Sequence, residues 1–190
     1  AYGYFPVGRD GYALRVFDAN GEIELGHFDL PRQRSGNRYC IADFFQDMTA
    51  DGRPADVLPM QAVTMGDKAS EVAQELFKGD QYSDYLYFHG LAVQMAEAMA
   101  EWVHARIRRE LGFADPEGMP LRDVLAQRYR GSRYSFGYPA CPNVADSRQQ
   151  LSWLGADRIG LSMDASDQLS PEQSTTALVA LHSKARYFSA

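Results

Sequence analysis

Residues 83–110, SDYLYFHGLAVQMAEAMAEWVHARIRRE, form the longest periodic stretch of the sequence. Their apolar side chains recur every three to four positions, which is the spacing of one face of an α-helix. We expect this stripe to pack against the core and the helix to end near Gly112. The stripe consists of Phe88, Ala92, Met95, Met99, Trp102 or Val103, and Ile107.

Three shorter segments around this stretch also predict helices. Residues 67–79, DKASEVAQELFKG, begin with Asp and end with Gly, which are typical start and stop signals of a helix. Residues 120–129, PLRDVLAQRY, and residues 146–155, DSRQQLSWLG, each predict one more short helix. The helices therefore occupy the middle of the chain.

Strand-like sequence occupies both ends of the chain. Near the start, YGYFPV and YALRVFD flank the turn-like GRDG, and DANG leads into EIEL, a pattern typical of an antiparallel meander. Residues 57–65, VLPMQAVTM, predict a buried strand. In the tail, RIGLSMD, TTALVALHS and ARYFS predict further strands at residues 158–164, 175–183 and 185–189. We therefore expect an α+β fold with a mainly antiparallel twisted sheet and a central helical segment.

Composition and charge restrict the class of protein. The 190 residues are 45% hydrophobic and 23% charged, which is typical of a globular domain. The net charge of −6 disfavours nucleic acid as a partner. No apolar run approaches the roughly 20 residues that span a bilayer, and no signal peptide is visible, so we expect no membrane partner. Two cysteines, Cys40 and Cys141, make no disulfide framework and favour the reducing cytoplasm.

The chain begins at Ala1, directly in strand-like sequence. We expect residues 1–190 to form a single domain that lacks its N-terminal segment and belongs to a longer protein. The sequence contains no metal-ligand spacing among its cysteines and histidines, no glycine-rich phosphate loop, and no recognisable nucleophile with its base. Glu97 and Glu101 share one helical face, where one carboxylate could hold an ammonium group or a sugar hydroxyl if that face lines a cleft.

The segment with the strongest binding signal is residues 130–142, RGSRYSFGYPACP, which we expect to be neither helix nor strand. Gly137 allows a backbone to approach a ligand closely or to take a positive φ. Arg133 beside a proline-stiffened backbone suits a carboxylate, which a guanidinium grips through two parallel hydrogen bonds. The aromatic residues of the loop offer flat faces for a purine. A packed surface loop explains the composition equally well.

A resemblance favours the binding interpretation. Residues 129–146, YRGSRYSFGYPACPNVAD, resemble the signature of the activation domain of cobalamin-dependent methionine synthase. That family marks its S-adenosylmethionine site with Arg-x-x-x-Gly-Tyr followed by Pro-Ala-Cys-Pro, which here spans residues 133–142. Similar stretches follow the family in the same order, namely GYFPVGRDGYALRVF, RYCIADFF, LAVQMAEAMAEWVHARIRRELG and LSPEQSTTALVALHSKARYF.

The resemblance implies a role for individual residues. Arg133 would bind the methionyl carboxylate of S-adenosylmethionine, and Glu97 would reach into the same site from its helix. Tyr187 and Phe188 would line the site from the end of the chain, and Tyr138 would lie near the docked corrin. The expected contact residues are Glu97, Arg133, Ser135, Gly137, Tyr138, Ala140, Tyr187 and Phe188. The family also uses an acidic residue from a segment that would precede Ala1.

The resemblance also implies a repair function within a methyltransferase of methionine biosynthesis. The domain would cap a cobalamin-binding domain while inactive cob(II)alamin receives an electron from a flavodoxin-like donor and a methyl group from S-adenosylmethionine. By itself the domain is expected not to be catalytic. Two alternatives remain open at this point: a module that docks onto a corrinoid protein without binding S-adenosylmethionine, and a self-contained enzyme of unknown chemistry.

Overall fold

The computed structural model describes residues 1–188. Its main feature is a six-stranded sheet with the strand order β3-β2-β1-β4-β8-β5, in which every neighbouring pair is antiparallel. The strands are β1 Tyr2–Asp10, β2 Ala13–Phe17, β3 Glu24–Asp29, β4 Asp56–Thr64, β5 Ser132–Tyr134 and β8 Ser174–Ala180. The short strands β6 Ser162–Met163 and β7 Leu169–Ser170 form a separate hairpin. The expected α+β fold with a mainly antiparallel sheet is confirmed.

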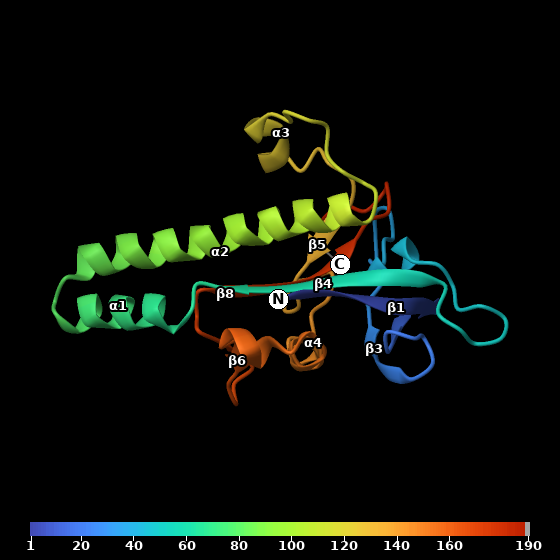
Figure 1. The fold of residues 1–190 in the computed structure, drawn as a ribbon, viewed down its shortest axis with the longest axis horizontal. Helices are drawn as coiled ribbons and strands as arrows, with labels where there is room; N and C mark the ends of the chain where they lie inside the picture. The colour runs from blue at the N-terminus through green and yellow to red at the C-terminus, as the bar shows by residue number, and fades with distance from the viewer. Residues whose placement is uncertain (189–190) are drawn as a thin grey trace.

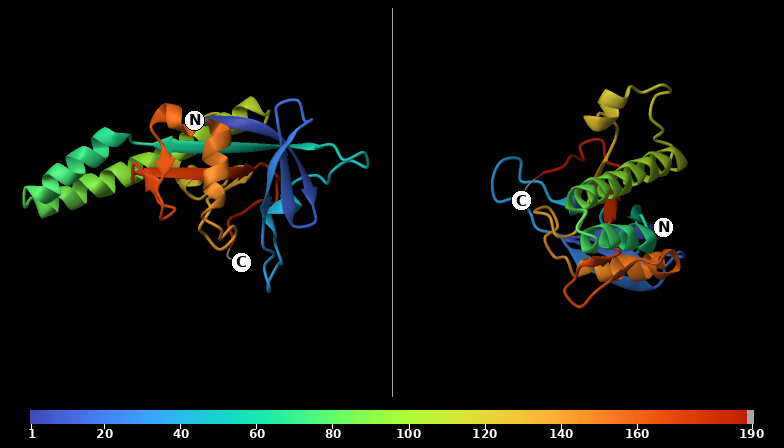
Figure 2. Two further views of the ribbon diagram at one scale, coloured as in Figure 1. Left: turned by 90° about the horizontal axis from the view of Figure 1, so that it is seen from below. Right: turned by 90° about the vertical axis from the view of Figure 1, so that its left-hand side faces the viewer.

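The helices cover both faces of this sheet (Figure 1). They are α1 Asp67–Lys78, α2 Tyr82–Glu110, α3 Leu121–Leu125 and α4 Asp146–Leu154, with the 3-10 helices η1 Ile41–Phe44 and η2 Ala156–Ile159. Helix α2 packs on β4 and β8 from one side, whereas α4 packs on β4 from the other. Helices α1 and α2 form a hairpin that extends past the end of the sheet (Figure 2).

Helix α2 buries only part of the apolar stripe that we expected: Ala92, Val103 and Ile107 are buried, as expected. Met95, Met99 and Trp102 belong to the predicted core stripe, but their side chains are 49%, 41% and 62% exposed. The buried apolar residues of the helix are Ala92, Ala96, Ala100, Val103 and Ile107. Small side chains let the helix axis approach the sheet closely, so the alanine face packs and the larger methionines and tryptophan remain outside.

Three further expectations were wrong, wholly or in part. Residues 132–134 lie in the segment expected to have no regular structure, yet they form strand β5, which pairs Arg133 with Val179. The ARYFS segment was expected to be a strand, but residues 185–188 have no regular secondary structure, and Ser189 lies outside the described residues. Part of RIGLSMD is the 3-10 helix η2 rather than a strand.

Strand β8 separates two apolar clusters because side chains alternate between the faces of a strand. Leu178 and Ala180 belong to the larger cluster, which also contains residues of α4 and η1. Val179 belongs to the smaller cluster beneath α2. Directly paired residues of antiparallel strands point to the same face, so Arg133, opposite Val179, points toward α2. Tyr134 points to the larger cluster.

Candidate functional site

A cavity of about 630 Å³ lies at the edge of the sheet, where β5 stops. Strand β5 ends with Tyr134 opposite Leu178, and residues 174–177 of β8 continue beyond it without that neighbour. Helix α2 contributes Glu97 to the cavity, and the loop after β5 contributes Ser135 and Tyr138. The remaining walls come from α4, from the β6–β7 hairpin and its flanks, and from the first residues of β8. The short length of β5 therefore creates the cavity.

The loop that borders the cavity is held in one shape by its own contacts. Gly137 has a φ of 90°, and a Cβ placed there would lie 2.9 Å from Cγ2 of Val144. The Gly137 amide donates to the Cys141 carbonyl at 3.0 Å, and the Cys141 amide donates to the Tyr138 carbonyl at 2.9 Å. The buried Cys141 thiol donates to the Ser135 carbonyl. Only glycine tolerates this backbone without strain, and the turn leaves the Tyr138 side chain 56% exposed.

Arg133 is held from helix α2 through one nitrogen. Its Nη1 donates to Oε2 of Glu101 at 2.6 Å and lies 3.2 Å from Nδ1 of His104. Within residues 1–188, Nε and Nη2 of Arg133 have no hydrogen-bond partner, and the side chain is 17% exposed. These two nitrogens form the edge of a guanidinium that matches the two oxygens of a carboxylate. The structure thus leaves the carboxylate-binding edge of Arg133 open.

Arg108, in the same polar layer, has the opposite arrangement. Its side chain is fully buried, and its Nε and Nη2 donate to the two carboxylate oxygens of Asp115 at 2.9 and 2.5 Å. Its guanidinium also lies over the Tyr129 ring, 3.8 Å from the centroid. Arg108 therefore already has its carboxylate, and of the two arginines only Arg133 can accept one from a ligand.

Burial sets the protonation states around Arg133. Burial raises the pKa of Tyr129 to about 12, with a further contribution from the charge of Glu101, so its hydroxyl stays protonated and donates to Oε2 of Glu101 at 2.8 Å. Burial, followed by the charges of Arg108 and Arg133, lowers the pKa of His104 to about 2, so this imidazole is neutral. The layer therefore contains two arginines and two carboxylates, with no additional charge from the histidine.

Six of the eight residues expected at the site divide into three groups. Glu97, Ser135 and Tyr138 line the cavity together. Arg133 is not itself among the lining residues, but it is two residues before Ser135, and its partner Glu101 follows Glu97 by one helical turn, which places Arg133 next to the cavity. Gly137 and the buried Ala140 shape the loop but are not among the lining residues.

The chain end reaches this region through Tyr134, the neighbour of Arg133. The Tyr134 hydroxyl donates to the Arg186 carbonyl at 2.6 Å, and the Tyr134 ring lies 5.8 Å from the ring of Phe188. Phe188 is buried in the larger cluster, whereas Tyr187 between these contacts is half exposed. Neither Tyr187 nor Phe188 lines the cavity, and their contact with a ligand stays a prediction.

The sequence did not identify His104 and Tyr129 as part of this arrangement, and it indicated Glu101 only as one of a like-charged pair. A usable signal was present, since Glu101, His104 and Arg108 recur at three- and four-residue spacing along one face of α2. That polar face turns toward β5 rather than toward solvent, which the sequence did not reveal. Between positions 1 and 188, no group of His, Cys, Asp or Glu residues is arranged to hold a metal ion.

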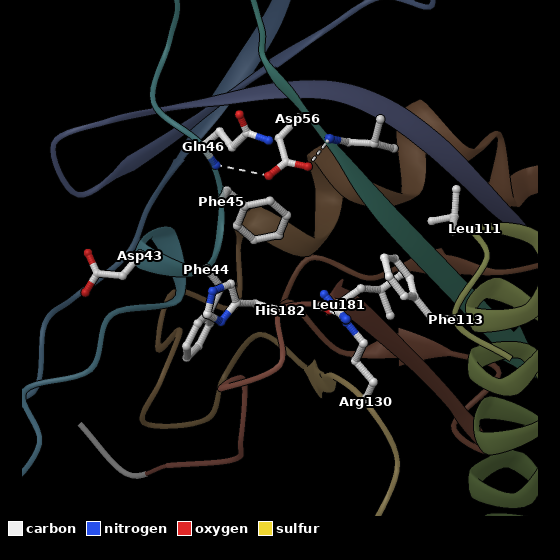
Figure 3. Close-up of a pocket in the computed structure, with 11 residues that line it drawn as sticks. Asp43, Phe44, Phe45, Gln46, Asp56, Leu111, Phe113, Arg130, Leu181 and His182 are labelled. Carbon is white, nitrogen blue, oxygen red and sulfur yellow. Dashed lines mark hydrogen bonds between the residues drawn. The ribbon is translucent and has the colours of Figure 1, made fainter. Parts of the chain in front are cut away.

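A second cavity, of about 490 Å³, lies at the other end of β8 (Figure 3). Two of its charged residues have partners within the protein: Arg130 donates through Nε to the Leu181 carbonyl at 2.7 Å and covers the Phe113 ring, and Asp56 accepts two backbone amides. None of the residues expected at the binding site lines it. The cavity at the sheet edge is therefore the candidate site.

An open arginine edge, a helix carboxylate and a fixed glycine loop around a cavity of this size are features of a small-molecule site, here on a domain of the α+β class. Comparison with known proteins names it more closely. The chain belongs to the family described as vitamin B12 dependent methionine synthase, activation domain, whose model matches residues 1–190.

Two curated relatives are methionine synthases of mycobacteria. The methionine synthase of Mycobacterium tuberculosis is 41% identical over 197 residues, and that of Mycobacterium leprae is 41% identical over 199 residues. Each match covers 98% of this chain but only 16% of the relative, so the chain spans less than a fifth of their length. A crystal structure of the MetH reactivation domain bound to AdoHcy matches with a TM-score of 0.89 and 25% identity, over 99% of this chain and 59% of that chain.

Within residues 1–188 the structure contains no helix that is both long and apolar enough to cross a membrane.

Proposed function

We propose that this chain binds S-adenosylmethionine in the cavity at the sheet edge and caps a cobalamin-binding domain during reductive remethylation of cob(II)alamin in methionine synthase. The observation that carries the proposal is the open Nε–Nη2 edge of Arg133 next to that cavity. The crystallised relative is bound to AdoHcy, which is S-adenosylmethionine without its methyl group. Membership in the activation-domain family further supports this ligand.

We assign each polar group of the ligand to a protein residue of complementary charge or hydrogen-bonding capacity. Arg133 pairs with the methionyl carboxylate through Nε and Nη2. Glu97, an exposed carboxylate on the cavity wall, attracts the ligand ammonium group. The Gly137 amide and the Ser135 carbonyl are used within the loop, and the remaining backbone groups at Ser135, Gly137 and Ala140 would supply hydrogen bonds whose directions are set before binding, which lowers the entropic cost of association.

Tyr138, Tyr187 and Phe188 complete the proposed site. The exposed ring of Tyr138 stands at the rim of the cavity, where a docked corrin would meet it. Tyr187 and Phe188 follow Arg186, whose carbonyl is fixed by Tyr134, so they lie next to the strand that carries Arg133. We propose that Tyr187 borders the ligand directly and that Phe188 supports it from the core.

The contribution of this chain to the reaction is position. The partner domain would hold the cobalamin, whose reduced cobalt would be the acceptor for the sulfonium methyl group. The residues of this chain orient the ligand so that its methyl group faces the partner and is in line for transfer. We propose that the chain alone does not catalyse methyl transfer, because the methyl acceptor belongs to the partner domain.

The partners in the proposal are a cobalamin-binding domain, in the same polypeptide or a separate one, and a flavodoxin-like electron donor. The relatives are much longer than this chain, which supports a role as one part of a larger enzyme. Cys40 and Cys141 are buried free thiols, which supports a place in the reducing cytoplasm.

Isothermal titration of the 190-residue chain with S-adenosylmethionine tests the proposal. We expect saturable binding with one site per chain and competition by AdoHcy. If the chain binds no S-adenosylmethionine but still associates with a cobalamin-binding domain, the alternative of a docking module without this ligand replaces our proposal.

A further inference from the structure

Nη1 of Arg133 carries two hydrogens, and helix α2 supplies an acceptor for each. Oε2 of Glu101 takes one at 2.6 Å, and Nδ1 of His104 lies 3.2 Å away to take the other. The two acceptors are three residues apart, so they lie on one face of the helix. Nη1 is therefore fully used, whereas Nε and Nη2 have no partner within residues 1–188.

The contact with His104 fixes the state of its ring. A guanidinium nitrogen can only donate, so Nδ1 must be the unprotonated nitrogen and the neutral ring carries its proton on Nε2. Nε2 is buried and has no hydrogen-bond partner in the described part of the chain. The side chain is fully buried, and its lowered pKa keeps it neutral at physiological pH. Within residues 1–188, the hydrogen bond from Arg133 is therefore the only one that the His104 ring makes.

An arginine side chain has several rotatable bonds, and an unrestrained guanidinium loses that freedom when it grips a ligand. Holding Nη1 at two points removes much of this freedom in advance and leaves the edge that matches a carboxylate. Because His104 is neutral, it orients Arg133 without repelling the negative charge of a ligand. Glu101 adds the stronger bond but also a charge of the wrong sign for that ligand.

We propose that His104, acting with Glu101, is a positioning residue that holds Arg133 by Nη1 and presents Nε and Nη2 to the carboxylate of the ligand. The inference rests on the proposed function, because it assigns a role in recognising the carboxylate of S-adenosylmethionine. It predicts that His104 determines how strongly the site prefers a ligand with a carboxylate to the same ligand without one.

The experiment compares S-adenosylmethionine with decarboxylated S-adenosylmethionine, which lacks only that carboxylate. The quantity measured by calorimetry is the ratio of their dissociation constants in each variant of the 190-residue chain. A variant that is partly unfolded weakens both ligands equally, so the ratio reports recognition rather than stability. His104→Leu removes the hydrogen-bond acceptor without a change of charge. Arg133→Ala gives the ratio of dissociation constants that is expected when the arginine is absent from the site.

Two polar variants form a matched pair that does not depend on the folding of the leucine variant. In His104→Asn the amide oxygen can occupy about the position of Nδ1, whereas in His104→Gln the amide lies one bond further out. We expect His104→Leu and His104→Gln to lower the preference for S-adenosylmethionine about 3- to 10-fold, the range for loss of one hydrogen bond. We expect His104→Asn to stay within about twofold of the wild type.

The outcomes separate the two proposals. An unchanged preference in both His104→Leu and His104→Gln, with a clear loss in Arg133→Ala, overturns the role of His104 and leaves the proposed function standing. If His104→Leu does not fold, the role of His104 is overturned when His104→Gln and His104→Asn prefer S-adenosylmethionine over its decarboxylated form to the same degree. Absence of S-adenosylmethionine binding by the wild type overturns both.

Discussion

Replacing Arg133 by alanine is the sharpest test of the candidate site. In the structure this residue offers two unpartnered nitrogens, Nε and Nη2, beside the cavity. A bidentate pair with a carboxylate consists of two charge-assisted hydrogen bonds, and its loss costs about 2–4 kcal/mol of binding free energy. At 1.36 kcal/mol for each factor of ten, Arg133→Ala should weaken S-adenosylmethionine about 30- to 900-fold.

The measurement is titration calorimetry with S-adenosylmethionine and, as a control ligand, adenosine. Adenosine has no carboxylate, so its affinity should change by less than about twofold in Arg133→Ala. Arg133→Lys is the matched control variant, because lysine keeps the positive charge but cannot form a bidentate pair with a carboxylate. We expect its affinity for S-adenosylmethionine to lie between those of the wild type and Arg133→Ala. The mutation also removes the ion pair with Glu101, so a thermal melt must establish that the variant is folded at the titration temperature. Equal affinity of wild type and Arg133→Ala for S-adenosylmethionine would remove Arg133 from the site.

Three other perturbations follow from the structure. Gly137→Ala places a Cβ 2.9 Å from Val144 at a backbone φ of 90°. We therefore expect the free energy of unfolding, followed by thermal melts, to fall by about 1–2 kcal/mol and S-adenosylmethionine to bind more weakly. An unchanged melting temperature and affinity would contradict the strain that we infer for the loop. Because folding lowers the pKa of His104 from 6.5 to about 2, His104 binds a proton below pH 6.5 in the unfolded chain but not in the folded chain. Stability should therefore fall by about 2 kcal/mol between pH 7 and pH 5, and urea titrations should show a flatter pH dependence for His104→Asn. Methylcobalamin formation from S-adenosylmethionine, cobalamin and a chemical reductant, followed by absorbance, should be faster with a cobalamin-binding domain than with this chain alone, and equal rates would refute the capping role.

The long helix illustrates what periodicity can and cannot predict. The three-to-four spacing correctly predicted the extent of α2, from Tyr82 to Glu110. It predicted the buried face only in part, because Met95 and Met99 form as regular a stripe as Ala96 and Ala100 do. Hydrophobicity favours the methionines, whereas close packing on β4 and β8 selects the alanines. The choice depends on the distance between helix and sheet, which is a property of the tertiary structure.

The site shows a similar limit. The loop of residues 130–142 was identifiable from its composition, and the resemblance to the activation-domain family is confirmed by the family match. The partners of Arg133 were not identifiable, because Glu101 and His104 precede it by 32 and 29 residues. Only the packing of α2 over β5 brings them together. Glu97 and Glu101 also have different roles in the folded chain: Glu97 lines the cavity, whereas Glu101 forms an ion pair with Arg133.

Strand β5 explains why these features coincide. Its three residues pair with the end of β8 and then stop, which leaves the sheet edge open for the cavity. The alternation of side chains along so short a strand sends Arg133 toward Glu101 and His104 and sends Tyr134 to the opposite face. There the Tyr134 hydroxyl fixes the segment that carries Tyr187 and Phe188. A longer β5 would cover the cavity, and a shift of its register by one residue would exchange Arg133 and Tyr134, so the length and register of this strand determine whether the site exists.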